Sequence, residues 1–201
     1  MREIGRILQL QVQRSSLKVG QRPHAHYDPA PLLVVDSLLI SPDGVVGLTA
    51  DGGKLIDVHN ARHPASKNRG ENGISVGFTS HYQAMRARCG PHLVDGCAGE
   101  NILVEAGRSF ALDDLGSAVA IQSSATGRIV YLTDLQVAAP CVEFSHFAAG
   151  QAANLEAEQL QAMLRFLDGG RRGFYAALAD QQQAVVQAGD RVFVADMIGG
   201  A

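Results

Sequence analysis

Cys141 is the residue of this sequence whose position best suits thiol chemistry. It follows Pro140 just after a predicted strand, VYLTDLQVA, and the proline fixes the backbone that presents the thiol to the surface loops. A thiol acts as a nucleophile, sulfur carrier or soft-metal ligand only as the thiolate, which nearby positive charge stabilises. Cys141 is therefore our candidate catalytic residue and metal ligand. The alternative is a buried structural cysteine.

Four basic residues are candidates for that positive charge. Lys67 and Arg69 lie in a long polar segment, residues 51–73, and Arg171 and Arg172 lie in the sequence GGRRG between two predicted helices. Guanidinium groups and the N–H groups at a helix N-terminus both bind anions. We expect these four residues to neutralise a small anionic ligand. The alternatives are a mobile surface loop at 51–73 and a solvated connector at GGRRG.

Glu100 and Asn101 are the polar candidates of the site. They close the run GCAGEN, which directly precedes a predicted strand. Glycines allow close backbone approach there, and the carboxylate and the amide could order a ligand by hydrogen bonds. A turn with local side-chain to backbone bonds is the alternative.

The elements that must position these residues are mostly strands. Alternating or continuous apolar runs predict strands at 6–13, 32–40, 45–48, 102–105, 118–122, 129–138, 184–187 and 191–195. Short helices are predicted at about 78–89, 155–168 and 173–180, the second with Asn154 as its N-cap. Because strands and helices do not alternate regularly, we expect a mainly β fold, an antiparallel barrel with a few capping helices. We expect residues 1–201 to form one domain.

The composition excludes several classes of function. The net charge of −3 leaves no basic surplus for a nucleic-acid backbone. No apolar run is long enough to span a membrane, and the N-terminal residues lack the continuous apolar stretch of a secretory signal, so we expect a cytoplasmic protein. Three cysteines, Cys89, Cys97 and Cys141, without a Cys-x-x-Cys pair argue against a disulfide framework or a zinc ribbon.

Taken in order, these motifs resemble the MOSC domain, the module named after the C-terminal part of molybdenum cofactor sulfurases. The resemblance covers about residues 40–195. It rests on Gly96, Gly99-Glu100-Asn101, LDDLG at 112–116, Pro140-Cys141, Gly173 with Tyr175, and Gly189-Asp190. Two positions depart from the family pattern: Ala139 stands where many members carry an arginine, and the His-Gly-Gly stretch is not intact.

The resemblance implies a β-barrel whose cysteine, here Cys141, carries sulfur or ligates a metal. Family members are linked to the molybdenum cofactor, to sulfur transfer and to reduction of N-hydroxylated compounds. Larger members add a pyridoxal-phosphate sulfurase domain. This chain would be the stand-alone form, without bound pyridoxal phosphate. A cysteine desulfurase would then be the sulfur donor, and Lys67, Arg69, Glu100, Asn101, Arg171 and Arg172 would hold the cofactor.

Three other functions stay open at this stage. The first is a non-catalytic β-barrel that binds a small ligand or a partner. The second is a cysteine hydrolase or transferase in which Cys141 works with His146 or His59. The third is a zinc site built from His24, His26, His59 and His63.

Overall fold

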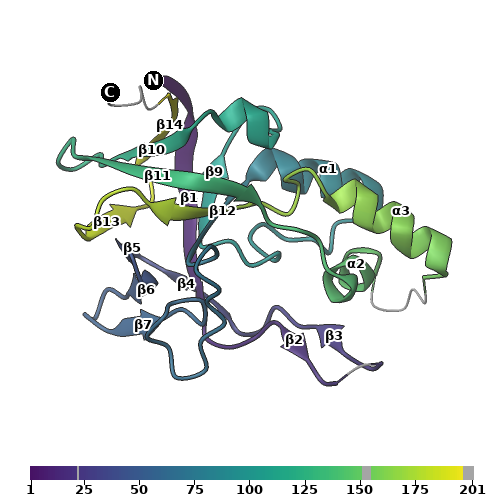
Figure 1. Ribbon diagram of the computed structural model, residues 1–201. Helices are drawn as coiled ribbons and strands as arrows, with labels where there is room; N and C mark the ends of the chain where they lie inside the picture. Colours follow the sequence, from purple (N-terminus) through teal and green to yellow (C-terminus); the bar gives the residue numbers. More distant parts are fainter. Residues whose placement is uncertain (22, 151–154, 197–201) are drawn as a thin grey trace.

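The chain folds around a closed β-barrel (Figure 1). The computed structural model describes residues 1–21, 23–150 and 155–196. Within these ranges seven strands pair in a ring that closes where β1 meets β14. In order around the barrel they are β14 (Arg191–Ala195), β10 (Ala118–Gln122), β11 (Ile129–Val137), β12 (Phe174–Leu178), β8 (Ile74–Phe78), β9 (Ile102–Glu105) and β1 (Arg2–Gln13). The predicted mainly β barrel is therefore confirmed.

The long strand β1 joins the barrel to its surroundings. Its first residues pair with β14, its middle with β9, and its last four with β4 (Leu32–Val35). Register shifts at two points let one strand serve three partners. Gly5 lies at the first shift, where a Cβ would come within 2.0 Å of the carbonyl oxygen of Glu105. Only glycine fits this close backbone approach.

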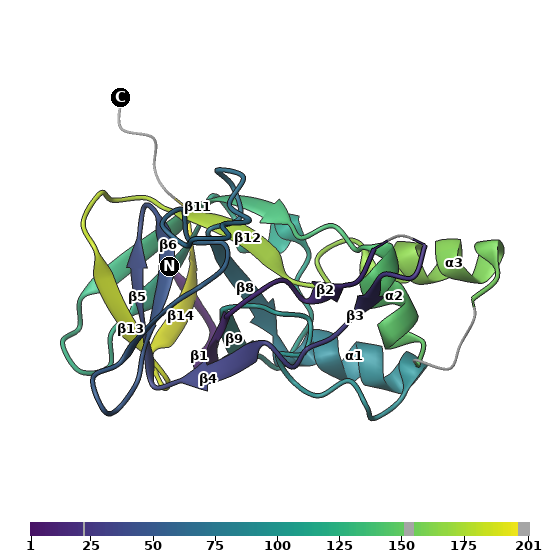
Figure 2. The same ribbon diagram turned by 90° about the horizontal axis from the view of Figure 1, so that it is seen from below.

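Two smaller sheets flank the barrel (Figure 2). One contains β13 (Ala184–Gln187), β5 (Ser37–Ser41), β6 (Gly44–Leu48) and β7 (Lys54–Ile56). The other is the short hairpin of β2 (Lys18–Val19) and β3 (His26–Tyr27), which lies beside helix α2 (Val142–Ala148). This hairpin and this helix later form walls of the candidate site.

The barrel pairs are antiparallel, except that β8 and β9 run parallel. A parallel pair needs a crossover, and the crossover contains helix α1 (Thr79–Cys89). Together with α2 and α3 (Ala157–Leu167), α1 sits to one side of the barrel (Figure 1). A 3₁₀ turn (Leu112–Leu115) precedes β10. None of the described helices is long and apolar enough to cross a membrane.

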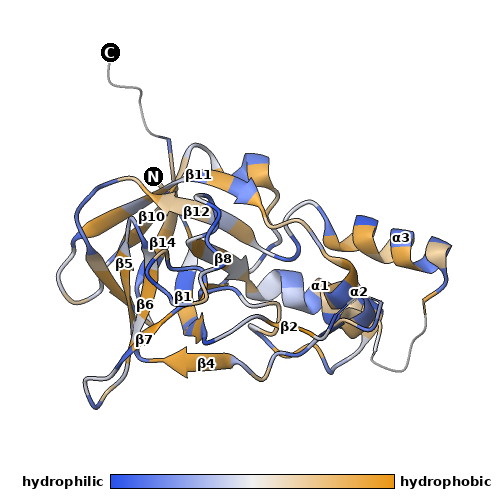
Figure 3. Ribbon diagram, turned by 60° about the horizontal axis from the view of Figure 1, so that its bottom comes forward, coloured by the Kyte–Doolittle hydropathy of each residue, from blue (hydrophilic) through white to orange (hydrophobic). Residues whose placement is uncertain are grey.

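Two apolar cores result from this arrangement. The first fills the barrel and includes Leu10, Ile40, Phe78 and Val192. The second lies among the helices and includes Tyr82, Phe144 and Leu167. In Figure 3 the barrel strands are mostly apolar, whereas α1 is pale to hydrophilic. The first turn of α1 is nevertheless buried, so its polar side chains must find partners inside the protein.

The structure corrects one predicted helix. Residues 173–180 do not form a helix, because Phe174–Leu178 is strand β12, paired with β8 and β11. The run FYAAL is too short for its apolar pattern to distinguish a helix from a strand. It forms a strand because β8 and β11 both offer free backbone pairing positions beside it. The helices predicted at 78–89 and 155–168 are confirmed as α1 and α3.

The helix α2 was not predicted, and it begins directly after Cys141. Its seven residues are too few to show a clear helical period. The predicted N-cap Asn154 lies outside the described residues; α3 starts after Glu156, whose N–H donates to Gln159 Oε1 over 3.0 Å.

His81 is a buried polar group that ties α1 to the following loop. Its Nε2 lies 3.1 Å from the backbone nitrogen and 3.0 Å from the carbonyl oxygen of Phe110, and its ring lies edge-on to Phe78. Burial, together with the nearby charge of Arg171, lowers the pKa of His81 from 6.5 to about 4, against the raising effect of backbone hydrogen bonds. The imidazole is therefore neutral in the folded protein at neutral pH.

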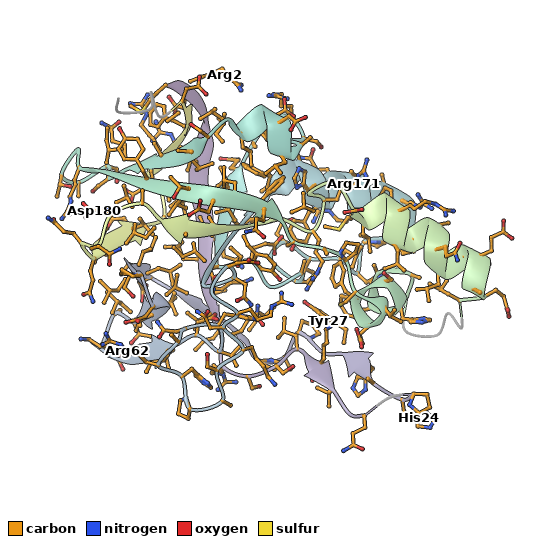
Figure 4. The ribbon with its side chains drawn as sticks, viewed as in Figure 1. Arg2, His24, Tyr27, Arg62, Arg171 and Asp180 are labelled. Atoms are coloured by element: carbon orange, nitrogen blue, oxygen red, sulfur yellow. The ribbon has the colours of Figure 1, made fainter. Side chains whose placement is uncertain are left out.

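Acid should destabilise the fold through His81. The unfolded chain binds a proton below pH 6.5 while the folded chain resists it until about 4, so the His81 contribution is complete above pH 6.5 and is lost as the pH falls. We expect the His81 contribution to fall by about 2 kcal/mol between pH 7 and pH 5. Because the buried Glu100 carboxyl changes stability in the opposite direction over this range, the contribution is measured by urea unfolding as the difference between wild type and His81→Gln at the two pH values. The same difference should be close to zero for His24→Gln, which changes an exposed histidine (Figure 4). An equal acid loss in both variants would contradict this assignment.

Candidate functional site

A cavity of about 710 Å³ opens at the ends of several barrel strands, beside the start of α2. Its walls come from the end of β1, the β2–β3 hairpin, the loop after β7, the residues before β9, the segment from β11 to α2, and the start of β12. The residues that line it and matter here are Lys18, Tyr27, His59, Lys67, Arg69, Asn72, Glu100, Gln136, Cys141, Arg172 and Tyr175. Five of the seven predicted site residues are among them.

Cys141 is the thiol that lines this cavity. It is partly exposed and occupies the N-cap position of α2, where its carbonyl oxygen accepts hydrogen bonds from the N–H and hydroxyl of Ser145, both over 2.9 Å. On its other side it packs against the helical core. The backbone around the thiol is therefore fixed from both sides.

The other two cysteines differ from Cys141. Cys97 is 2% exposed, and burial raises the pKa of its thiol to about 12. Cys89 lies 3.9 Å from the sulfur of Met163, and burial raises its pKa as well. Cys97 is a core thiol, whereas Cys89 is partly exposed like Cys141. Neither lines the cavity, so both provide controls for Cys141 within the same chain.

Three of the four predicted cations border the cavity. Lys67 and Arg69 are exposed at its rim, and Arg172 lies partly buried in its wall. Arg171 does not contribute: its guanidinium lies 4.7 Å from the ring centre of Phe166 and donates to the Phe166 carbonyl (Figure 4). Adjacent residues in GGRRG thus point to different places, which the motif by itself did not show.

Arg172 is the cation that interacts electrostatically with both Cys141 and Glu100. Its Nη1 donates to the carbonyl of Ala139 over 3.1 Å, and its guanidinium lies 5.3 Å from the ring centre of Phe144. Burial lowers its pKa, but the negative forms of Tyr27, Cys141, Tyr175 and Glu100 together raise it above the usual arginine value. The Nε atom is buried and has no hydrogen-bond partner among the described residues.

Glu100 lies beneath Arg172 as a buried carboxyl group. Its Oε2 accepts a hydrogen bond from the hydroxyl of Tyr82 over 2.7 Å. Burial raises the pKa of Glu100 to about 7, against the lowering effects of the Tyr82 bond and the Arg172 charge. Two glycines make room for it: a Cβ at Gly77 would lie 2.4 Å from Oε1, and one at Gly173 would lie 3.0 Å from Cγ.

Asn101 was predicted to hold a ligand, but the structure places it behind the cavity wall. Its Oδ1 accepts from the N–H and hydroxyl of Ser75, and its Nδ2 donates to Asp57 Oδ2 over 2.9 Å. It also donates to the carbonyl of Gln11. With these bonds the side chain connects β1, β8 and the loop after β7, so its role is to position the wall.

Asp57 and His59 form a hydrogen-bonded pair, which the sequence analysis did not predict. Asp57 is fully buried; its Oδ2 accepts from the N–H of Gln13, and its Oδ1 accepts from the N–H of His59 over 2.7 Å. The ring Nδ1 of His59 lies 3.2 Å from the same Oδ1. The ring is thereby oriented along the cavity wall.

The polar segment after β7 is an ordered loop, held by asparagine side chains. Asn68 Nδ2 donates to the carbonyl of His59, while Asn72 accepts from the N–H of Arg69 and donates to the carbonyl of Lys67. These bonds replace regular backbone pairing. The asparagines at 60, 68 and 72 were the available sequence signal for an ordered loop.

The histidine alternatives receive no support from the geometry. His146 lines a separate cavity of about 370 Å³ with His26 and Glu143, not the cavity of Cys141. His59 shares the cavity with Cys141, but its imidazole bonds Asp57. Within the described ranges, no group of three or more His, Cys, Asp or Glu side chains could hold a metal ion, so the proposed zinc site lacks a ligand set.

Comparisons with known proteins place this fold. Residues 57–193 match the family model of the MOSC domain. The YuaD protein from Bacillus subtilis is similar in structure, with a TM-score of 0.61 and 16% identity over 96% of both chains. YiiM from Geobacillus stearothermophilus has a TM-score of 0.52 and 14% identity, over 95% of this chain and 75% of that one. No curated protein matches the sequence. Because the family model covers most of the chain, from Asp57 just after β7 to Phe193 in β14, this chain belongs to the MOSC domain family.

Proposed function

We propose that this domain binds the molybdenum cofactor in the 710 Å³ cavity, with Cys141 as the residue that ligates the metal or accepts sulfur. One observation carries the proposal. The cavity brings the partly exposed thiol together with Lys67 and Arg69 from the loop after β7 and with Arg172 from the segment before β12. Arg172 interacts electrostatically with Cys141, and the two further cations line the same cavity. Positive charge of this kind favours both a thiolate and an anionic ligand.

The residues present fit such a group. The volume lies within the range of cofactor sites, which is on the order of 300–1,000 Å³. The unpartnered Nε of Arg172 can donate to an oxyanion, and the rim cations Lys67 and Arg69 can neutralise its charge. When bound, the cofactor would supply a redox-active molybdenum, and thiolate sulfur is a suitable ligand for a soft metal. Arg172, donating to the Ala139 carbonyl, brings a guanidinium beside the position where Ala139 replaces the family's arginine.

The same thiol suits a sulfur carrier. In that reaction the Cys141 thiolate attacks the outer sulfur of a persulfide on a cysteine desulfurase. A new S–S bond forms at Cys141, the S–S bond of the donor breaks, and the electron pair leaves with the donor thiolate. No net oxidation occurs. A cytoplasmic location belongs to this proposal, because a desulfurase partner and free thiols suit a reducing compartment.

Loss of the Cys141 sulfur should abolish both roles. After incubation with a cysteine desulfurase and free cysteine, we expect mass spectrometry to find persulfide on Cys141, with Cys89 and Cys97 at least tenfold lower.

Protein purified from cells that make the cofactor should retain molybdenum, and Cys141→Ser should retain at least tenfold less while Cys89→Ser resembles wild type. Equal labelling of the three thiols would contradict a special role for Cys141. Full cellular function of Cys141→Ser would favour the non-catalytic binding domain.

The two neighbouring arginines should behave differently. Arg172→Gln removes a buried donor from the cavity and should weaken binding of the cofactor by about 10- to 100-fold. Arg171→Gln removes a contact with Phe166 outside the cavity, and cofactor affinity should change less than about twofold. Fluorescence titration with the isolated cofactor measures both variants. Similar losses in the two would show that the cavity wall does not make the contact.

A further inference from the structure

Arg172 is partly buried and Glu100 is buried, and each has one buried side-chain atom without a hydrogen-bond partner among the described residues. In the described part of the chain, neither Arg172 Nε nor Glu100 Oε1 has a hydrogen-bond partner, and both residues border the cavity. They are also close in the fold, because Gly173, next to Arg172, leaves room for the Glu100 side chain. A buried polar atom without a partner calls for an explanation, such as a ligand or a proton.

We propose that oxyanion binding at Arg172 is coupled to protonation of Glu100, so that the cavity takes up a proton together with its ligand. This inference rests on the proposed function and identifies the ligand group at Arg172 as a multiply charged oxyanion. The ionised Glu100 stabilises Arg172 but repels an incoming anion. The neutral Glu100 leaves the arginine free to pair with the anion. Linkage then requires the anion to favour the neutral acid.

The surroundings of Glu100 single it out as the group that takes up the proton. The titratable groups that face it are Tyr82 from α1, Tyr27 from β3, Asp95 and Cys97 from the segment before β9, and Arg172 from the segment before β12. Burial raises the pKa values of the two tyrosines and of Cys97 far above neutrality, so these groups stay neutral. Asp95 is paired with Arg86 at 2.6 Å.

The Glu100 carboxyl group can also gain or lose a proton without breaking its existing hydrogen bonds. Tyr82 donates to Oε2, and the Tyr82 oxygen in turn accepts the N–H of Ala98 over 2.9 Å. A proton can therefore be placed on Oε1 while both bonds remain. The pKa near 7 that burial gives Glu100 agrees with a group that changes charge at neutral pH.

Sulfate is the probe for this proposal, because it remains a dianion throughout the neutral pH range. Calorimetry of sulfate binding in buffers of different ionisation enthalpy measures the protons taken up. For the wild type we expect uptake of about half a proton near pH 7 and a roughly tenfold loss of affinity as the pH rises from about 6.5 to 8.5. Glu100→Gln should lose most of the uptake and most of the pH dependence. The matched control Glu71→Gln, which replaces an exposed carboxylate at the same cavity, should behave like the wild type.

A second measurement needs no variant that changes the fold. The carboxyl carbon resonance of Glu100, followed by NMR across the pH range, should show a pKa that rises when sulfate is added. Sulfate binding that is independent of pH, or proton uptake that disappears only in His59→Gln, would overturn the coupling and leave the proposed function standing. Absence of sulfate binding by the wild type would overturn the coupling and the anion site together.

Discussion

The buried carboxylate of Asp57 is the interaction on which the site depends. It is fully removed from water and accepts hydrogen bonds from Gln13, Asn101 and His59. A buried charge is stable only when its oxygens are satisfied in this way. The bonds join the end of β1, the residue before β9 and the start of the 57–73 loop. That loop carries Lys67 and Arg69, so this carboxylate helps to hold the rim of the cavity at the barrel, together with the N–H of Val58, which donates to the carbonyl of Gln13 over 2.8 Å.

The second apolar core holds the thiol of Cys141 in place, as Asp57 holds the 57–73 loop. Phe144 and Tyr27 pack edge to face, with ring centres 5.0 Å apart, and they join α2 to the β2–β3 hairpin. Tyr27 also donates its hydroxyl to the carbonyl of Cys97 over 2.9 Å. Because α2 starts at Cys141, the packing of this core sets where the sulfur lies. The cavity is thus the space between two cores, and residues from both line it.

Charge balance at the cavity depends on few groups. Arg172 lies partly buried among Tyr27, Tyr175, Cys141 and Glu100, and the ionised forms of these neighbours would favour its charged state. In the folded protein burial disfavours ionisation of Tyr27 and raises the pKa of Glu100 to about 7. Because Tyr27 stays neutral and Glu100 is only partly ionised near pH 7, these two neighbours do not fully balance the charge of Arg172, and this supports the choice of an anionic ligand. The chain as a whole is slightly acidic, so the composition gives no hint of this local field.

The barrel class and the helices at 78–89 and 155–168 could be predicted from the sequence, because alternating apolar residues and turn residues act locally. The strand at 174–178 could not be predicted, since FYAAL becomes a strand only where β8 and β11 offer free pairing positions. Nor could the sequence separate Arg171 from Arg172, or Glu100 from Asn101. Each of these pairs occupies neighbouring positions on one strand end or loop, and only the tertiary packing decides which side chain faces the cavity and which faces Phe166 or Asp57.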